Sequence, residues 1–88
     1  MLKADGFDEA IIGQAYVWRD QGMHNVLVYD AEKMRSILMK RDGMEPDEAR
    51  EYIEYNVEGA YVGVETPVFV WTDDLEMIDI NSVETKPD

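Results

Sequence analysis

Val26 to Gly43 reads VLVYDAEKMRSILMKRDG, an apolar tetrapeptide followed directly by residues at helical spacing. The tetrapeptide Val26–Tyr29 is typical of a short strand. Asp30 is a good N-cap, because its carboxylate can accept hydrogen bonds from the free amides of a first helical turn. Gly43 suits the position after a helix, where the backbone is often left-handed. The stretch therefore predicts a strand that leads directly into a helix over residues 31–42.

A second helix is predicted after a short turn. Pro46 fits a first helical position, and Glu48 stands three residues after Glu45, as in a capping box. One face of this helix is marked by residues at helical spacing, namely Ala49, Tyr52, Ile53, Asn56, Val57 and Ala60. Asn56 is the polar member of that face, so we expect it to be buried and hydrogen-bonded to a neighbouring backbone. The alternative is that Asn56 points into a pocket and contacts a ligand.

Two further segments, one on each side of the helices, predict strands. Ala10–Trp18 reads AIIGQAYVW and precedes a polar loop over Arg19–Asn25, while Thr66–Thr72 reads TPVFVWT. The resulting order is β-β-α-α-β, which predicts an α+β domain with a small antiparallel sheet of three strands and two helices on one face. Leu75–Ile80 fits either a fourth strand or a single helical turn. We expect residues 1–80 to form one domain and residues 81–88 to form a flexible acidic tail.

Composition excludes several classes of function. The 88 residues include no cysteine and one histidine, and they carry a formal charge of −12. Disulfides, thiolate metal sites and cysteine nucleophiles are therefore absent. The strong negative charge argues against direct binding of nucleic acid or of anionic membranes. Neither a membrane-spanning apolar run nor a leader-like N-terminus is visible, so we expect a cytoplasmic protein.

The candidate catalytic and metal-binding residues are weak. Asp30 and Asp42 would lie about 17 Å apart at opposite ends of a helix, too far to share a proton. His24 falls in the predicted loop without a partnered acid. The acidic cluster Asp73–Glu76 lacks the ligand spacing of a calcium loop. We therefore predict a protein that is not an enzyme and that has no catalytic residue, metal or cofactor.

Aromatic residues provide the strongest signal for an interaction. Tyr16 and Trp18 share one face of the first predicted strand, and Phe69 and Trp71 share one face of the third. Both faces of the sheet would then be apolar, although the helices could cover only one. Either the segment 75–80 covers the second face, or the aromatic residues bind a second copy or another protein. The prediction is an interaction face at Tyr16, Trp18, Phe69 and Trp71, with a homodimer expected.

An acidic stripe on the second helix provides an alternative. Its carboxylates recur at i, i+4, i+7 and i+11, with axial steps of about 4.5–6 Å, which is comparable to phosphate spacing along a nucleic-acid strand. Such a face could mimic nucleic acid towards a basic protein, or it could simply be solvated. The stripe consists of Asp47, Glu51, Glu54 and Glu58.

Several segments together resemble a group of short, acidic, uncharacterised proteins encoded by bacteriophages, cyanophages included, and by prophages. The resemblance spans roughly residues 5–71, and residues 14–25 are the least similar part. In these proteins Thr or Ser more often stands where this chain has Glu45. The group has no assigned activity, so the resemblance implies no chemistry. It implies only that this is a phage-type accessory protein that acts in a bacterial cell. The segments are DGFDEAIIG (5–13), VLVYD (26–30), ILMKRDGM (37–44), DEAREYIEYNVEGAYVG (47–63) and TPVFV (66–70).

The sequence thus favours a non-enzymatic protein-interaction or regulatory module that acts on a host or phage protein. One alternative is a nucleic-acid mimic that inhibits a DNA- or RNA-binding host protein. Another is a structural homo-oligomer. The sequence does not identify the partner.

Overall fold

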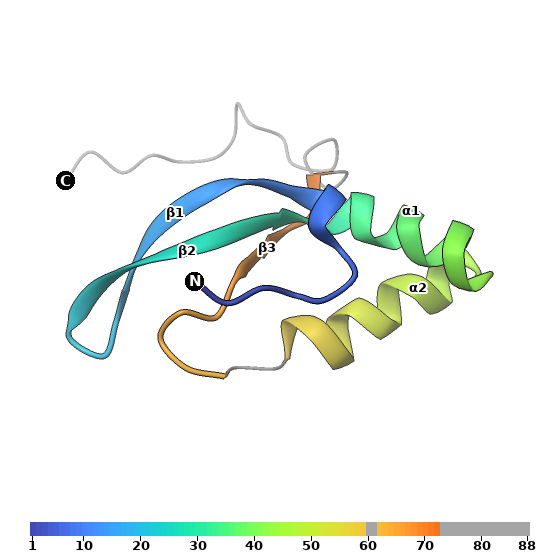
Figure 1. The fold of residues 1–88 in the computed structure, drawn as a ribbon. Helices are drawn as coiled ribbons and strands as arrows, with labels where there is room; N and C mark the ends of the chain where they lie inside the picture. Colours follow the sequence, from blue (N-terminus) through green and yellow to red (C-terminus); the bar gives the residue numbers. More distant parts are fainter. Residues whose placement is uncertain (60–61, 73–88) are drawn as a thin grey trace, which may run out of the picture.

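The computed structural model describes residues 1–59 and 62–72 and has an α+β fold (Figure 1). The element order β-β-α-α-β is confirmed. The predicted segment 75–80 and the predicted tail 81–88 lie outside the described residues. The elements are the short 3-10 helix η1 (Asp8–Ala10), β1 (Ile11–Arg19), β2 (Gly22–Asp30), α1 (Ala31–Asp42), α2 (Pro46–Ile53), the π-helical turn η2 (Glu54–Glu58) and β3 (Val68–Val70).

The hairpin of β1 and β2 is longer than predicted, because its turn consists of only two residues. Asp20 and Gln21 have φ of 49° and 65°, the left-handed conformation that two-residue turns of type I′ require. Such turns usually contain Asn-Gly, whereas this chain has Asp20-Gln21, so the polar segment Arg19–Asn25 did not indicate a two-residue turn. The predicted loop over Arg19–Asn25 is therefore wrong. His24, expected in that loop, lies half-buried in β2 opposite Val17.

The sheet is mixed rather than antiparallel. Its order is β1-β2-β3; β1 is antiparallel to β2, whereas β3 is parallel to β2, with Val28 opposite Val68. A parallel neighbour requires a crossover connection, and here α1, α2 and the following loop supply it. The prediction that the third strand is antiparallel is therefore wrong, because it did not take this crossover connection into account. The third strand is also shorter than predicted.

The loop that precedes β3 is held against the hairpin. One guanidinium nitrogen of Arg19 donates to the carbonyl oxygens of Thr66 at 2.7 Å and Val64 at 3.2 Å. The hydroxyl of Thr66 donates to the Gly63 carbonyl and accepts from the Val62 amide. These bonds fix the starting point of β3 beside β2.

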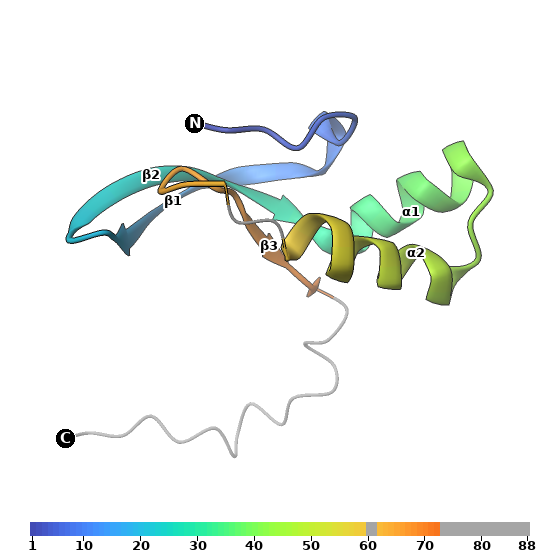
Figure 2. The same cartoon turned by 90° about the horizontal axis from the view of Figure 1, so that it is seen from below.

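The two helices lie side by side in opposite directions at one end of the sheet, instead of extending across one of its faces (Figures 1 and 2). The core forms where the helices meet the end of β2. Tyr29 is fully buried, stacks on Phe69 with ring centroids 5.4 Å apart, and accepts a hydrogen bond from the Ala4 amide. The largest side chains buried in the same cluster are Met34, Leu38 and Ile53.

The helix ends agree with the sequence except at the end of α2. The carboxylate of Asp30 accepts from the amides of Glu32 and Lys33 at 3.0 and 3.2 Å, and the capping box of α2 is present. After Ile53, however, the helix continues as the π turn η2. A π turn has i→i+5 bonds and changes the angular spacing of later side chains. Asn56 is consequently exposed, so the prediction that it is buried is wrong.

Candidate interaction surface

Tyr16 and Trp18, here called the aromatic pair, are exposed on the outer half of the hairpin. Their exposed fractions are 72% and 69%. The register places Tyr16 opposite Asn25 and Trp18 opposite Met23, so the pair lies on one face of the sheet near the hairpin turn. Large exposed aromatic side chains on a strand are typical of protein-binding surfaces.

The strands beneath the aromatic pair hold its position. The amide nitrogen of the Asn25 side chain donates to the side-chain oxygen of Gln14 at 2.7 Å, from β2 to β1. The antiparallel ladder continues on either side of this bond, from Gly13 to Arg19. The two rings therefore project from a regular strand, so binding requires little ordering of the backbone beneath them.

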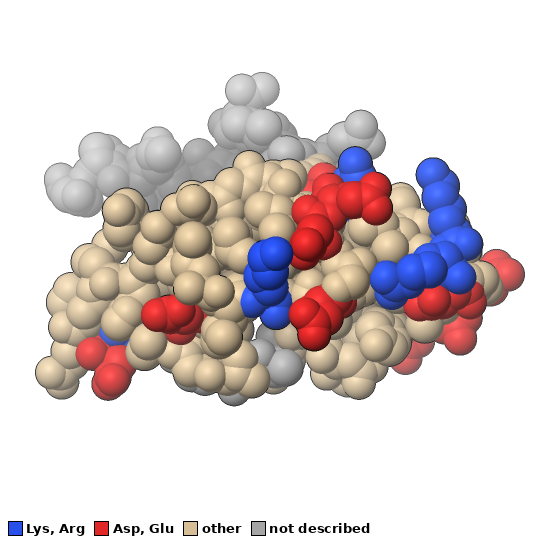
Figure 3. Space-filling view, viewed as in Figure 1, with Lys and Arg blue, Asp and Glu red and all other residues tan. Residues whose placement is uncertain are grey.

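The surroundings of the aromatic pair are almost uncharged. Of the 28 charged residues in the chain, only Arg19 and Asp20 fall between Ala10 and Tyr29, and their charges cancel. In Figure 3 the charged side chains are concentrated over the helical end of the molecule, with few over the hairpin. Depletion of charge around aromatic residues is characteristic of the buried centre of an interface.

Phe69 and Trp71 do not join the aromatic pair. Phe69 lies beside Tyr29 in the core, and the Trp71 ring lies 4.1 Å below the guanidinium of Arg50. Because Phe69 is in register with Tyr29, it lies about 20 Å along β2 from the strand position facing Trp18. The four residues of the predicted interaction face thus lie at two separate places, although the register keeps Phe69 on the same face of the sheet as Tyr16 and Trp18.

The acidic stripe is exposed over its first three residues. Asp47, Glu51 and Glu54 lie on the solvent side of α2 and η2, and the side chain of Glu58 is not among those described. A nitrogen of Arg50 lies 3.7 Å from a carboxylate oxygen of Glu54. A cation therefore partly neutralises the stripe at Glu54.

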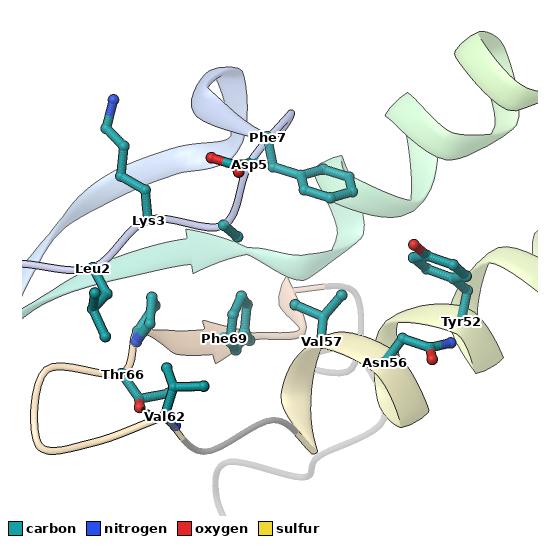
Figure 4. Close-up of a pocket in the computed structure, with 12 residues that line it drawn as sticks. Leu2, Lys3, Asp5, Phe7, Tyr52, Asn56, Val57, Val62, Thr66 and Phe69 are labelled. Atoms are coloured by element: carbon teal, nitrogen blue, oxygen red, sulfur yellow. Dashed lines mark hydrogen bonds between the residues drawn. The ribbon is translucent and has the colours of Figure 1, made fainter.

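A cavity of about 320 Å³ lies between the N-terminal segment, η2 and the loop before β3 (Figure 4). Phe7, Val57 and Phe69 give it an apolar wall, and Asn56 lies at its edge. Lining a cavity is the alternative role that the sequence left open for Asn56. The volume of the cavity is at the lower limit for ligand-binding sites. Sequence analysis missed the cavity because distant segments form it.

An ion pair at the N-terminus is a further electrostatic feature of the described residues. The N-terminal ammonium lies 2.9 Å from the carboxylate of Glu65 and lowers the pKa of that exposed group. Within residues 1–59 and 62–72, no group of three His, Cys, Asp or Glu residues is arranged to hold a metal ion. In the same part of the chain, no helix has the length and apolar character needed to span a membrane.

No protein-family model, curated protein or solved structure matches this chain. Its possible functions are therefore inferred from its own geometry. The feature that stands out is the aromatic pair, because it combines high exposure, a regular strand and neutral surroundings.

Proposed function

We propose that this protein is a small, acidic, non-enzymatic interaction module that binds a partner protein through Tyr16 and Trp18. The observation that carries the proposal is the exposure of both rings, 72% and 69%, in a stretch of the hairpin whose only two charges cancel. The resemblance to phage-encoded proteins implies that the partner is a host or phage protein and that the site of action is the bacterial cytoplasm.

Burial of the aromatic pair supplies a physical reason for binding. Tyr and Trp side chains each bury a large area when a partner covers them, and they dominate the energetics of many interfaces. Because only two charged residues fall between Ala10 and Tyr29, a partner that covers this part of the hairpin removes few charges from water. The cost of desolvating charges is therefore small.

An affinity capture with matched variants tests the proposal. The purified chain is immobilised and exposed to a lysate of the bacterial host, in parallel with a Tyr16→Ala, Trp18→Ala variant and a Tyr55→Ala control. Tyr55 is 76% exposed but lies on η2 at the helical end. We expect the double variant to lose specific proteins that the control retains. A folded double variant that captures the same proteins contradicts the proposal.

Nucleic-acid mimicry by α2 is the second candidate, favoured by the exposure of Asp47, Glu51 and Glu54 on one side of the helix. Binding of this kind should weaken steeply between low and high salt, because it depends on exposed charges. Binding through the aromatic pair should respond little to salt. A captured protein that is released by salt and lost on Glu51→Lys supports mimicry instead.

We also propose that the chain forms a homodimer. Wherever the protein is present, a second copy of it is available at the same concentration, which favours self-association. A structural homo-oligomer would use the same neutral hairpin, because two chains of formal charge −12 repel one another elsewhere.

A further inference from the structure

The outer edge of β1 has no neighbouring strand among the described residues. The sheet order is β1-β2-β3, so β1 and β3 are its two edges. β1 contains nine residues, Ile11–Arg19, whereas β3 contains only three and follows Pro67. An unpaired edge presents backbone donors and acceptors that can pair with another strand. The long edge is therefore the candidate for intermolecular pairing.

From Gln14 to Trp18, the β1 edge lacks the features that usually block such pairing. Proteins protect exposed edges with charged residues, proline, irregular backbone or very short strands. Between Ile11 and Trp18 there is neither a charged residue nor a proline. The register irregularity lies at Ile11/Gly13, so the strand is regular from Gln14 to Arg19. That regular half carries the aromatic pair.

The distribution of charge favours a second copy of this chain as the partner that pairs with the β1 edge. Two chains of formal charge −12 repel one another most where their acidic residues meet. At the hairpin the charges of Arg19 and Asp20 cancel, and antiparallel pairing of two β1 edges would direct the helical ends away from each other. The longest dimension of the molecule is 47 Å, well beyond the Debye length of about 8 Å at physiological salt.

We infer that the edge of β1 pairs antiparallel with the same edge of a second copy. The two sheets become continuous, and the two aromatic pairs lie side by side on one face. The inference deepens the proposed function, on which it rests, because the surface presented to any further partner then contains four aromatic rings. The pairing requires β1 to lie at the two-fold axis and β2 to lie one strand further out.

Disulfide trapping tests the position of the axis, because the natural chain contains no cysteine. Cysteine is placed singly at Gln14, Tyr16 or Trp18, and the variants are oxidised alone and in pairwise mixtures. Met23→Cys is the control, since Met23 is on the same face but in β2. Two copies of residue 23 would lie at least about 14 Å apart, because three strand spacings separate them, and this distance is too long for a disulfide.

Edge pairing predicts rapid cross-linking of at least one β1 combination and none of Met23→Cys. Comparable cross-linking of Met23→Cys overturns the inference, because it indicates that two faces meet rather than two edges. Absence of cross-linking from every β1 combination overturns it as well.

Sedimentation of charge variants gives an independent measurement. Tyr16→Glu places two like charges near the axis, so we expect the dimer dissociation constant to rise by at least about tenfold. Tyr55→Glu makes the same chemical change at the helical end, and we expect a change below about twofold. Equal effects of the two variants, or a natural chain that stays monomeric into the millimolar range, contradict the inference.

The two proposals can fail separately. A monomeric chain that still captures a protein through the aromatic pair retains the interaction module and removes both the homodimer and the edge pairing. A dimer that cross-links as expected but captures nothing retains the edge pairing and leaves a structural homo-oligomer in place of the interaction module.

Discussion

Five of the aromatic residues that the structure describes fall into two groups by their surroundings. Tyr29 and Phe69 stack in the core, and Trp71 packs against it below Arg50, whereas Tyr16 and Trp18 project from the hairpin. Loss of a side chain from the first group should therefore affect folding. Loss from the second group should affect binding and leave folding nearly unchanged.

The first prediction compares the two tryptophans. Trp71→Ala should lower the free energy of unfolding by about 1–3 kcal/mol, because it removes core packing and the contact with Arg50. Trp18→Ala should lower it by less than about 1 kcal/mol, because the ring is 69% exposed. Urea denaturation of the two variants measures both values. A larger loss for Trp18→Ala contradicts the assignment of the two rings.

The second prediction concerns the hydroxyl of Tyr29. Tyr29→Phe retains the stacked ring but removes the acceptor of the Ala4 amide hydrogen bond. Stability should fall by about 1 kcal/mol, while the exposed control Tyr55→Phe should leave it unchanged. Chemical denaturation provides the comparison. Equal stabilities of the two variants would show that the N-terminal segment is not held by this bond.

At the scale of elements, the sequence predicted local structure better than connections between elements. The cap at Asp30 and the left-handed Gly43 were predicted, because each depends on a few neighbouring residues. The parallel direction of β3 depends on the path of a long crossover, which no local pattern encodes. The exposure of Asn56 follows from a π turn, which has no clear sequence signal. Tyr16 and Trp18 were identified as exposed candidates, but their separation from Phe69 required the tertiary structure.

The hairpin turn permits a third prediction. Gln21 has φ of 65°, a conformation that costs residues with a side chain more than it costs glycine. Gln21→Gly should therefore raise the free energy of unfolding by about 0.5–1 kcal/mol. Gln14→Gly, in the regular part of β1, should lower it. Thermal melting checks both, and a destabilising Gln21→Gly would contradict the turn geometry.

At the scale of the whole molecule, charge is unevenly distributed. Half of the eight basic residues lie in α1, and the hairpin carries almost no charge. The remaining surface is strongly acidic, so repulsion between carboxylates opposes folding at low salt. The basic residues of α1 are Lys33, Arg35, Lys40 and Arg41.

The fourth prediction follows from this repulsion. Raising sodium chloride from about 10 to 300 mM shortens the screening length from roughly 30 to 6 Å. The melting temperature should rise by about 4–8 °C for each kcal/mol of repulsion that is screened. Scanning calorimetry at several salt concentrations measures the change. A melting temperature independent of salt would mean that carboxylate repulsion does not limit stability.

The central claim is that the hairpin around Trp18 is the interaction surface, and a single-tryptophan variant tests it most directly. Trp71→Phe leaves Trp18 as the only indole in the chain. Acrylamide quenching of its fluorescence is measured while the protein is concentrated and while a captured partner is added. We predict efficient quenching of the dilute chain and of the edge-paired dimer, whose rings stay on an open face, and strong protection of Trp18 when a captured partner binds. Trp18 that stays fully accessible in the complex with a captured partner would contradict the account.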